Sequence, residues 1–139
     1  ILFGLFIAFV FWIILKIFSF KDFIKGLILY DENSIYFNND SVLISTKEKQ
    51  LISFLSENPF ITAPRVNTII SKQNFAKSHF TSLRNKLIDN LNNKLFQLTK
   101  IEKCIIETKD PKDNRIKAYK ADSSIIKKKI GFLRFLFKR

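Results

Sequence analysis

The sequence is poor in the residues that disulfide frameworks, metal centres and phosphate-binding loops require. Its 139 residues include one Cys, one His, three Gly, three Pro and no Met. A single Cys cannot form an internal disulfide, and we interpret Cys104 as a small buried residue of a strand, in agreement with a reducing compartment. The glycines Gly4, Gly26 and Gly131 are too scattered for a phosphate-cradling loop. Because a Cys/His cluster and a second His are missing, we expect no enzyme, no bound metal and no cofactor.

Polar side chains are absent from the first fifteen residues of the chain. A helix needs roughly 20 apolar residues to cross a bilayer core. The sequence therefore predicts a transmembrane helix at residues 1–20, interrupted by Lys16 and Ser19, and a juxtamembrane linker at residues 21–26. A signal peptide is the alternative, but its small-residue cleavage site is missing. In the helix we expect Trp12 and Lys16 to contact lipid.

The charges that flank the apolar run indicate its orientation. Lys16, Lys21 and Lys25 follow it, so the positive-inside rule favours a single pass of the inner membrane with the rest of the chain in the cytoplasm. The first residue is not an initiator Met. We therefore expect the sequence to be the carboxy-terminal part of a longer protein, with membrane or sensory parts upstream.

Acidic residues are absent from residues 123–139, which carry six Lys and Arg. These cations alternate with apolar residues at roughly helical spacing, which predicts a basic amphipathic tail that lies on a membrane as an interfacial helix. The alternative is a basic tail whose apolar residues dock on the domain. The tail residues expected to contact lipid are Lys127, Lys128, Lys129 and Arg134.

The net charge of +12 is unevenly distributed along the rest of the chain. Residues 21–75 carry six cations and six acids, whereas residues 76–122 carry eleven cations and six acids. Such an asymmetry indicates a polyanionic partner, either nucleic acid or an anionic membrane surface.

Residues 27–122 are enough for one small hydrophobic core. They begin with three strand-like segments that predict a small antiparallel sheet, at Leu27–Tyr30, Ser34–Phe37 and Ser41–Ile44. Ser45 then begins a helix, because Glu48 three residues later completes a capping box. Asn58 and Pro59 end that helix.

Two more helices follow in the predicted order. Thr62 can cap a short helix with Pro64 in its first turn. The next helix is the longest, and its apolar stripe recurs at helical spacing at Phe80, Leu83, Leu87, Leu91 and Leu95. Its outward face is polar and partly basic, with Ser78, His79, Ser82, Asn85 and Lys86.

A β-hairpin is predicted after the long helix. Its strands are Lys103–Thr108 and Arg115–Lys120, and residues 109–114 join them. This connection predicts a charged tip that is too long for a two-residue turn. The order of helices and strands predicts an α+β fold.

Three segments resemble winged helix-turn-helix domains. STKEKQLISFL at residues 45–55 and SHFTSLRNKL at residues 78–87 resemble the DNA-binding domain of OmpR-type response regulators, in which a small leading sheet precedes three helices. TKDPKDNR at residues 108–115 resembles the wing of MarR-type repressors. The resemblance spans roughly residues 27–122. It implies a winged-helix domain on a membrane-anchored transcriptional regulator that binds duplex DNA through the third helix and the wing.

The resemblance also implies which residues contact DNA. On the third helix, bases would be read by Ser78, His79, Ser82, Asn85 and Lys86, and phosphates would be contacted by Lys77 and Arg84. In the wing, the backbone contacts would be Lys109, Lys112, Arg115 and Lys117. Aspartates at the wing tip would brace the turn, and one of them would pair with Arg115.

An interaction protein of a different class is the alternative function. A winged helix, or the cationic surface of the domain, would then bind a protein or anionic lipid at the membrane. The location of the net charge of residues 76–122 separates the two readings, because a concentration on the third helix and wing favours DNA. A homodimer and an upstream sensory region remain open as further partners.

Overall fold

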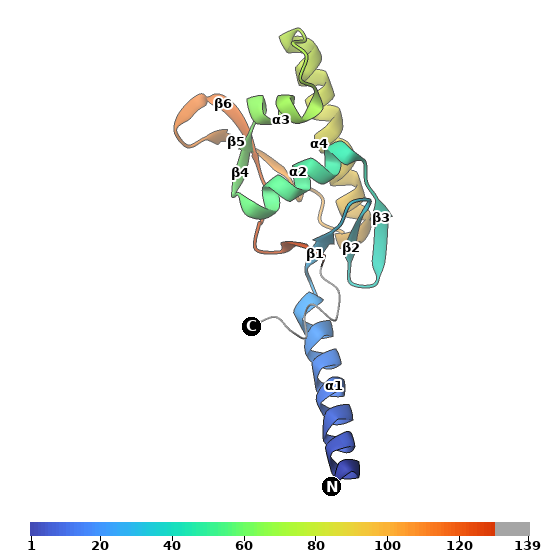
Figure 1. Ribbon diagram of the computed structural model, residues 1–139. Helices are drawn as coiled ribbons and strands as arrows, with labels where there is room; N and C mark the ends of the chain where they lie inside the picture. Colours follow the sequence, from blue (N-terminus) through green and yellow to red (C-terminus); the bar gives the residue numbers. More distant parts are fainter. Residues whose placement is uncertain (130–139) are drawn as a thin grey trace.

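The computed structural model describes residues 1–129, and within them four helices and seven strands form an α+β protein, as the sequence predicts. Helix α1 (Leu2–Ile24) projects from one end of a folded domain that contains the other described elements (Figure 1). The domain combines two sheets with three helices, so its core lies between sheets and helices.

Helix α1 is apolar along most of its length. Its segment Leu2–Asp22 has 21 residues and a mean hydropathy of 2.4, and none of it is buried against the rest of the protein. At 1.5 Å per residue the segment is about 31 Å long, close to the thickness of a bilayer core. Length and composition therefore allow α1 to cross a membrane. The helix continues to Ile24 and ends before Gly26, whose φ is 76°. The linker predicted at residues 21–26 is thus mostly helical, because nothing before the glycine breaks the helix.

The first sheet has the strand order β3-β2-β1-β7. Strands β1 (Ile28–Tyr30), β2 (Ser34–Phe37) and β3 (Asp40–Leu43) pair antiparallel. This confirms the predicted leading sheet, with ends that differ by at most one residue. Strand β7 (Ile126–Lys128) pairs in parallel with the other side of β1.

The amphipathic helix predicted for the tail is wrong at residues 126–128, which form strand β7. The backbone N–H of Lys129 donates to the carbonyl of Tyr30 at 2.8 Å, and the side chain of Ile126 is 2% exposed in the core. These residues pair with the open edge of β1, which local helical spacing cannot reveal. The folded unit therefore runs past its predicted carboxy-terminal boundary. Residues 130–139, with the predicted lipid contact Arg134, lie outside the described residues.

Helix α2 (Thr46–Glu57) begins with the predicted capping box. The Ser45 hydroxyl accepts a hydrogen bond from the N–H of Glu48 at 3.2 Å, and the Glu48 carboxylate accepts one from the N–H of Ser45 at 3.1 Å. The ammonium of Lys94, in helix α4 (Lys77–Thr99), lies 2.6 Å from the same carboxylate. Glu48 thus ties the start of α2 to α4 while it caps its own helix.

The second sheet has the strand order β4-β6-β5. Strands β5 (Ile106–Asp110) and β6 (Asp113–Lys120) form the predicted hairpin, and β4 (Phe60–Thr62), which no sequence signal predicted, pairs with β6. Strand β4 leads directly into α3 (Ala63–Ile70), which has Pro64 in its first turn but no capping hydrogen bond from the Thr62 side chain. The sheet therefore joins the hairpin to the start of α3.

The tip of the hairpin is shorter than predicted. Asp110 and Asp113 pair across the strands, so the turn consists of two residues, Pro111 and Lys112. The Asp110 carboxylate accepts a hydrogen bond from the N–H of Lys112 at 2.9 Å, and the Asp113 carboxylate accepts one from the N–H of Arg115 at 3.0 Å. The expectation of a longer turn is wrong. The two carboxylates accept hydrogen bonds from backbone N–H groups at the tip, so Asp110 and Asp113 belong to the strands and not to the turn.

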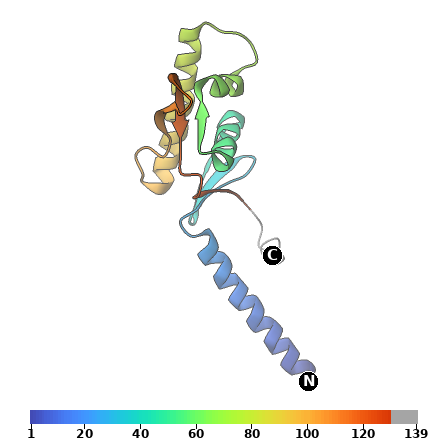
Figure 2. The ribbon, with the colours of Figure 1, turned by 90° about the vertical axis from the view of Figure 1, so that its left-hand side faces the viewer.

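The core is formed by both sheets with α2, α3 and α4. Its largest fully buried side chains are Ile28, Ile35, Leu51, Ile52, Leu55, Ile61, Val66, Leu91, Leu95 and Ile126. On α4 the predicted stripe is fully buried at Leu91 and Leu95, whereas Phe80, Leu83 and Leu87 are partly buried. Both views show why, because the first turns of α4 extend beyond the body of the domain at the end opposite to α1 (Figures 1 and 2).

A buried amide fixes the chain where it leaves α4. The side-chain Nδ2 of Asn92 donates to the carbonyl of Ile105 at 2.9 Å, and its Oδ1 accepts from the N–H of the same residue at 2.8 Å. Asn92 is 9% exposed and Ile105 is 2% exposed. The segment that leads into the hairpin is therefore attached to α4 by the two hydrogen bonds of one side chain.

Candidate nucleic-acid interface

The protruding end of α4 is held by an aromatic cluster. The connection from α3, residues 71–76, brings Phe75 against His79 and Phe80, with ring centroids 4.8 Å and 5.3 Å apart. Phe80 in turn packs against the core. The loop and the first turns of α4 are thus joined to the domain on one side, while the opposite side of the helix stays open.

The polar face predicted on α4 is exposed. Ser78, Ser82 and Asn85 are spaced by four and three residues, which places them on one side of the helix. The other predicted contact residues that are exposed on this half of the helix are Lys77, His79 and Lys86. Six polar or charged side chains therefore face solvent at the end of the domain that lies farthest from α1.

Arg84 does not share this exposure, which corrects its predicted contact with phosphate. Its side chain is 7% exposed, its Nε donates to the hydroxyl of Tyr119 at 2.9 Å, and its Nη1 donates to Oδ1 of Asn67 at 3.0 Å. The salt bridges among the described residues do not include Arg84. Helical spacing puts this residue on the same side as Ile88 and Leu91, so its guanidinium joins α4 to α3 and β6 beneath the surface.

Asn67 and Tyr119 are positioning residues that sequence reasoning missed. They lie 17 and 35 residues from Arg84 along the chain. Neither belongs to a motif, and each looks like an ordinary member of its helix or strand. No local signal could have found them, because their role depends on how α3, α4 and β6 meet.

The tip of the hairpin contains the aspartate–arginine pair that the wing resemblance implies. Arg115 Nε lies 3.1 Å and its Nη2 3.3 Å from the two carboxylate oxygens of Asp113. Hydrogen bonds from the Arg115 side chain, and then from its backbone N–H, hold the pKa of Asp113 below its usual value. Arg115 is therefore oriented by its neighbour and its charge is partly balanced.

The other hairpin cations predicted to contact DNA differ in their exposure and in whether they form a salt bridge. Lys109 and Lys112 are exposed and form no salt bridge with any described residue. Lys117 is partly buried, and its ammonium lies 3.2 Å from the Glu107 carboxylate. The two lysines at the tip are thus the hairpin cations best able to meet an anion.

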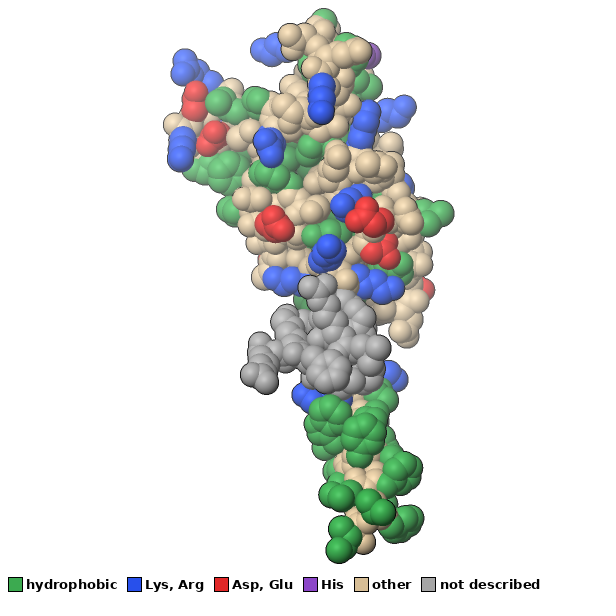
Figure 3. All heavy atoms as spheres, in the orientation of Figure 1, with side chains coloured by type: hydrophobic (Ala, Val, Ile, Leu, Met, Phe, Trp, Pro, Cys, Tyr) green, Lys and Arg blue, Asp and Glu red, His purple; other side chains and the backbone are tan. Residues whose placement is uncertain are grey.

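The net charge of residues 76–122 is concentrated on these two elements. Residues 77–88 of α4 carry three cations and no acid, and residues 106–120 of the hairpin carry five cations and three acids. The remaining residues of this stretch carry three cations and three acids. Figure 3 shows Lys and Arg side chains over the hairpin and the upper end of the domain, and others over its middle and base, above an apolar α1. Even with Arg84 buried, the exposed excess lies on α4 and the hairpin.

The described residues predicted to contact lipid, among residues 1–129, lie at the other end of the molecule. Trp12 stacks on Phe9 in α1, with ring centroids 6.1 Å apart, and the ammonium of Lys16 lies 6.0 Å from the centre of the Trp12 ring. Of the tail lysines, Lys127 and Lys128 belong to β7. Lys129 follows them, with its ammonium 3.9 Å from the ring of Tyr36.

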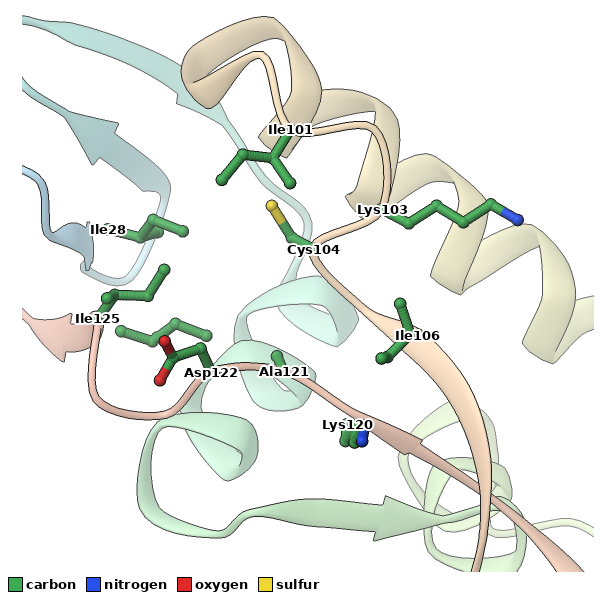
Figure 4. A pocket seen from close by; sticks show the side chains of 10 residues that line it. Ile28, Ile101, Lys103, Cys104, Ile106, Lys120, Ala121, Asp122 and Ile125 are labelled. Atoms are coloured by element: carbon green, nitrogen blue, oxygen red, sulfur yellow. The ribbon is translucent and has the colours of Figure 1, made fainter.

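A pocket of about 450 Å³ lies at the base of the domain. Its walls are mostly aliphatic and come from β1, the chain after α4, the ends of the hairpin strands, and the chain from β6 into β7. They include Ile28, Ile101, Ile106, Ala121, Ile125 and Ile126. Figure 4 shows the Cys104 sulfur directed inward and the Lys103 ammonium directed away. Asp122 is exposed, and its carboxylate accepts hydrogen bonds from the N–H and the hydroxyl of Ser124. Burial raises the pKa of the Cys104 thiol. This cysteine is half-buried and precedes β5, so it does not lie in a strand as predicted.

Comparisons of the chain with protein-family models, curated proteins and solved structures found no match. Among residues 1–129, no group of three or more His, Cys, Asp or Glu side chains is placed to hold a metal ion. The surface formed by α4 and the hairpin must therefore be interpreted from its own chemistry.

Proposed function

We propose that the domain after α1 is a winged helix-turn-helix domain that binds duplex DNA, and that the chain is a transcriptional regulator anchored in the inner membrane by α1. The observation that carries this proposal is the excess of positive charge on the first half of α4 and on the hairpin. DNA is a polyanion, and a protein that neutralises its phosphates gains affinity by releasing counterions.

The protruding half of α4 has the dimensions and side chains that major-groove reading requires. Residues 77–88 span about 18 Å of helix, and the major groove is about 12 Å wide, enough to admit an α-helix. Ser78, Ser82 and Asn85 would reach base edges from one face of the helix, and Asn85 could bind adenine with both atoms of its amide. Lys77 and Lys86 would contact the phosphates on either side.

The hairpin would act as the wing. Lys109 and Lys112 would contact the sugar-phosphate backbone, while the Asp113–Arg115 pair keeps the tip in one shape. Pairing of β4 with β6, and the contacts of Arg84 with Asn67 and Tyr119, fix the hairpin relative to α3 and α4. The helix and the wing would then approach DNA as one rigid surface.

The location of this surface suits a membrane-anchored regulator. The first turns of α4 lie at the end of the domain opposite to α1 (Figure 1). A duplex could then approach from the cytoplasm without meeting the bilayer, in the orientation that Lys21 and Lys25 favour.

Salt dependence of DNA binding tests the proposal. We expect the full chain, held in nanodiscs of zwitterionic lipid, to bind a fluorescent duplex in an anisotropy titration. Four or five phosphate contacts from α4 and the hairpin should give a slope of about −4 in a plot of log K against log salt. If binding is absent at low salt, or if its affinity does not depend on salt concentration, the proposal of DNA binding is contradicted and the alternative interaction module is favoured.

Two single substitutions separate base reading from phosphate binding. Asn85→Ala should reduce sequence discrimination at one base pair by about 1–3 kcal/mol, because it removes a bidentate contact. Lys112→Ala should instead weaken all sequences alike and reduce the salt slope by about 1. Competition titrations with single-base operator variants measure both effects. Equal losses on every sequence for both variants would show that α4 does not read bases.

A further inference from the structure

Four exposed lysines surround the place where α1 meets the domain. Lys21 lies in the last turn of α1, and Lys25 is its C-cap residue. The parallel pairing of β7 with β1 then brings two tail lysines beside them, because Lys127 is opposite Leu29 and Lys128 is opposite Tyr30. We call Lys21, Lys25, Lys127 and Lys128 the basal lysines.

When α1 crosses a bilayer, Lys21 and Lys25 lie at the depth of the lipid headgroups, and Lys127 and Lys128 lie beyond them, beside the second and third residues of β1. The apolar segment ends at Asp22, and each headgroup layer beyond the hydrocarbon core is about 5–8 Å thick. Three residues, 25–27, separate the end of α1 from Ile28, the first residue of β1, and Lys127 is opposite the second residue of β1. Long lysine side chains can extend to headgroups from this position.

The two edges of the leading sheet differ in charge at this end. Strand β7 forms one edge with Lys127 and Lys128, whereas β3 forms the other edge and begins at Asp40. The turn before β3 also lies next to the membrane helix, because the N–H of Gly26 donates to Oδ1 of Asn38 at 3.3 Å. An anionic surface would therefore attract the β7 edge and not the β3 edge.

Lys129 differs from the basal lysines because its ammonium is already engaged. It lies over the ring of Tyr36, 3.9 Å from the centre, and the hydroxyl of Tyr36 donates to the Asp31 carboxylate at 2.8 Å. A backbone hydrogen bond from Asn33, together with the Tyr36 and Ser34 bonds, keeps the pKa of Asp31 below its usual value, and the charge of Lys129 acts in the same direction. This cluster occupies the ammonium of Lys129, whereas the side chains of the basal lysines are exposed and can contact lipid.

We propose that the basal lysines bind the anionic headgroups of the bilayer that α1 crosses, and that they hold the β7 edge of the domain against the membrane. This inference rests on the proposed membrane span of α1 and not on DNA binding. At residues 126–128 it replaces the interfacial helix, which was predicted for residues 123–139, by a strand edge that presents its lysines at the membrane. The consequence is a fixed orientation of the domain, with the first turns of α4 directed away from the lipid.

Chemical modification of individual lysines tests this contact in the full chain. The protein is placed in nanodiscs of phosphatidylcholine alone, or with about 30% phosphatidylglycerol, and acetylated briefly before mass spectrometry. We expect the basal lysines to react about threefold more slowly in the anionic discs, because bound ammonium groups are less nucleophilic and less accessible. The difference should disappear at about 1 M salt, where the Debye length is about 3 Å. Lys77 and Lys112, at the far end of the domain, are internal controls whose rates should not depend on lipid.

A paired substitution separates the β7 contact from the contacts of α1 itself. Lys127→Gln with Lys128→Gln should restore the modification rate of Lys25 in anionic discs toward its value in neutral discs, whereas Lys77→Gln with Lys112→Gln should not. Equal rates in both lipids, or slowing of the basal and far lysines alike, would overturn the proposal. Failure of α1 to span would be seen separately, as loss of the protein from neutral discs, and the assay contains no DNA.

Discussion

Asn92→Leu is expected to lower the free energy of unfolding by about 2–5 kcal/mol, because it leaves two buried backbone groups without partners. The amide of Asn92 donates to the carbonyl of Ile105 and accepts from its N–H, at 2.9 Å and 2.8 Å. Leucine has a similar volume, so the change removes hydrogen bonds with little change in packing. The loss should also free the segment that leads into the hairpin.

Urea unfolding of the full chain in nanodiscs, followed by circular dichroism, measures this effect. Asn93→Leu is the matched control, because Asn93 is the exposed neighbour on the same helix. A surface change of this kind usually alters stability by no more than about 0.5 kcal/mol. An unchanged unfolding midpoint for Asn92→Leu would mean that the backbone of Ile105 finds other partners.

Tyr119→Phe should lower the free energy of unfolding by about 1.5–3 kcal/mol, because it removes a hydrogen bond to a buried charge. The hydroxyl of Tyr119 accepts from Nε of Arg84 at 2.9 Å, and no described acid forms a salt bridge with this guanidinium. With the hydroxyl gone, one charged donor remains buried beside an apolar ring. Asn67 alone would then be left to compensate it.

A double-mutant cycle shows whether Arg84 and Tyr119 act as a unit. Arg84→Met removes the charge and keeps much of the side-chain length, and the double substitution replaces both partners by apolar groups. Such a replacement can be nearly neutral, so the double variant should lose less stability than the sum of the single variants. Strict additivity would contradict a direct interaction.

The same variants decide between the two roles considered for Arg84. If Arg84 positions α4 from below, Arg84→Met leaves the salt slope of DNA binding unchanged. Lys86→Ala, on the exposed face two residues away, should reduce that slope by about 1. A reduction for Arg84→Met would instead return the residue to its predicted phosphate contact.

Features encoded by neighbouring residues were predictable from the sequence. The capping box needs Ser45 and Glu48 three residues apart, and its hydrogen bonds form as expected. The leading sheet was also predicted closely, because polar turn residues separate short apolar segments. The exposure of Ser78, Ser82 and Asn85 follows from helical spacing and is observed.

Features that depend on a distant partner were missed. Strands β4 and β7 have three residues each, too few for an alternating pattern, and they exist because β6 and β1 offer them an edge. Arg84 was interpreted as a phosphate contact from the winged-helix resemblance, although helical spacing puts it on the same side as Ile88 and Leu91. Its burial is possible because Asn67 and Tyr119 supply acceptors from other elements.

The parallel pairing of β7 with β1 also constrains the order in which the protein is made. Strand β1 follows α1 and is synthesised before α2, α3 and α4, whereas β7 is the last described element to leave the ribosome. Contacts so far apart in sequence form slowly, because a long loop must close before they form. α1 can therefore enter the membrane while the sheet beside it still lacks a strand, and during that interval the edge of β1 is open to pairing with another chain. A late-arriving strand that closes this edge would end the period in which the nascent domain is most exposed to aggregation.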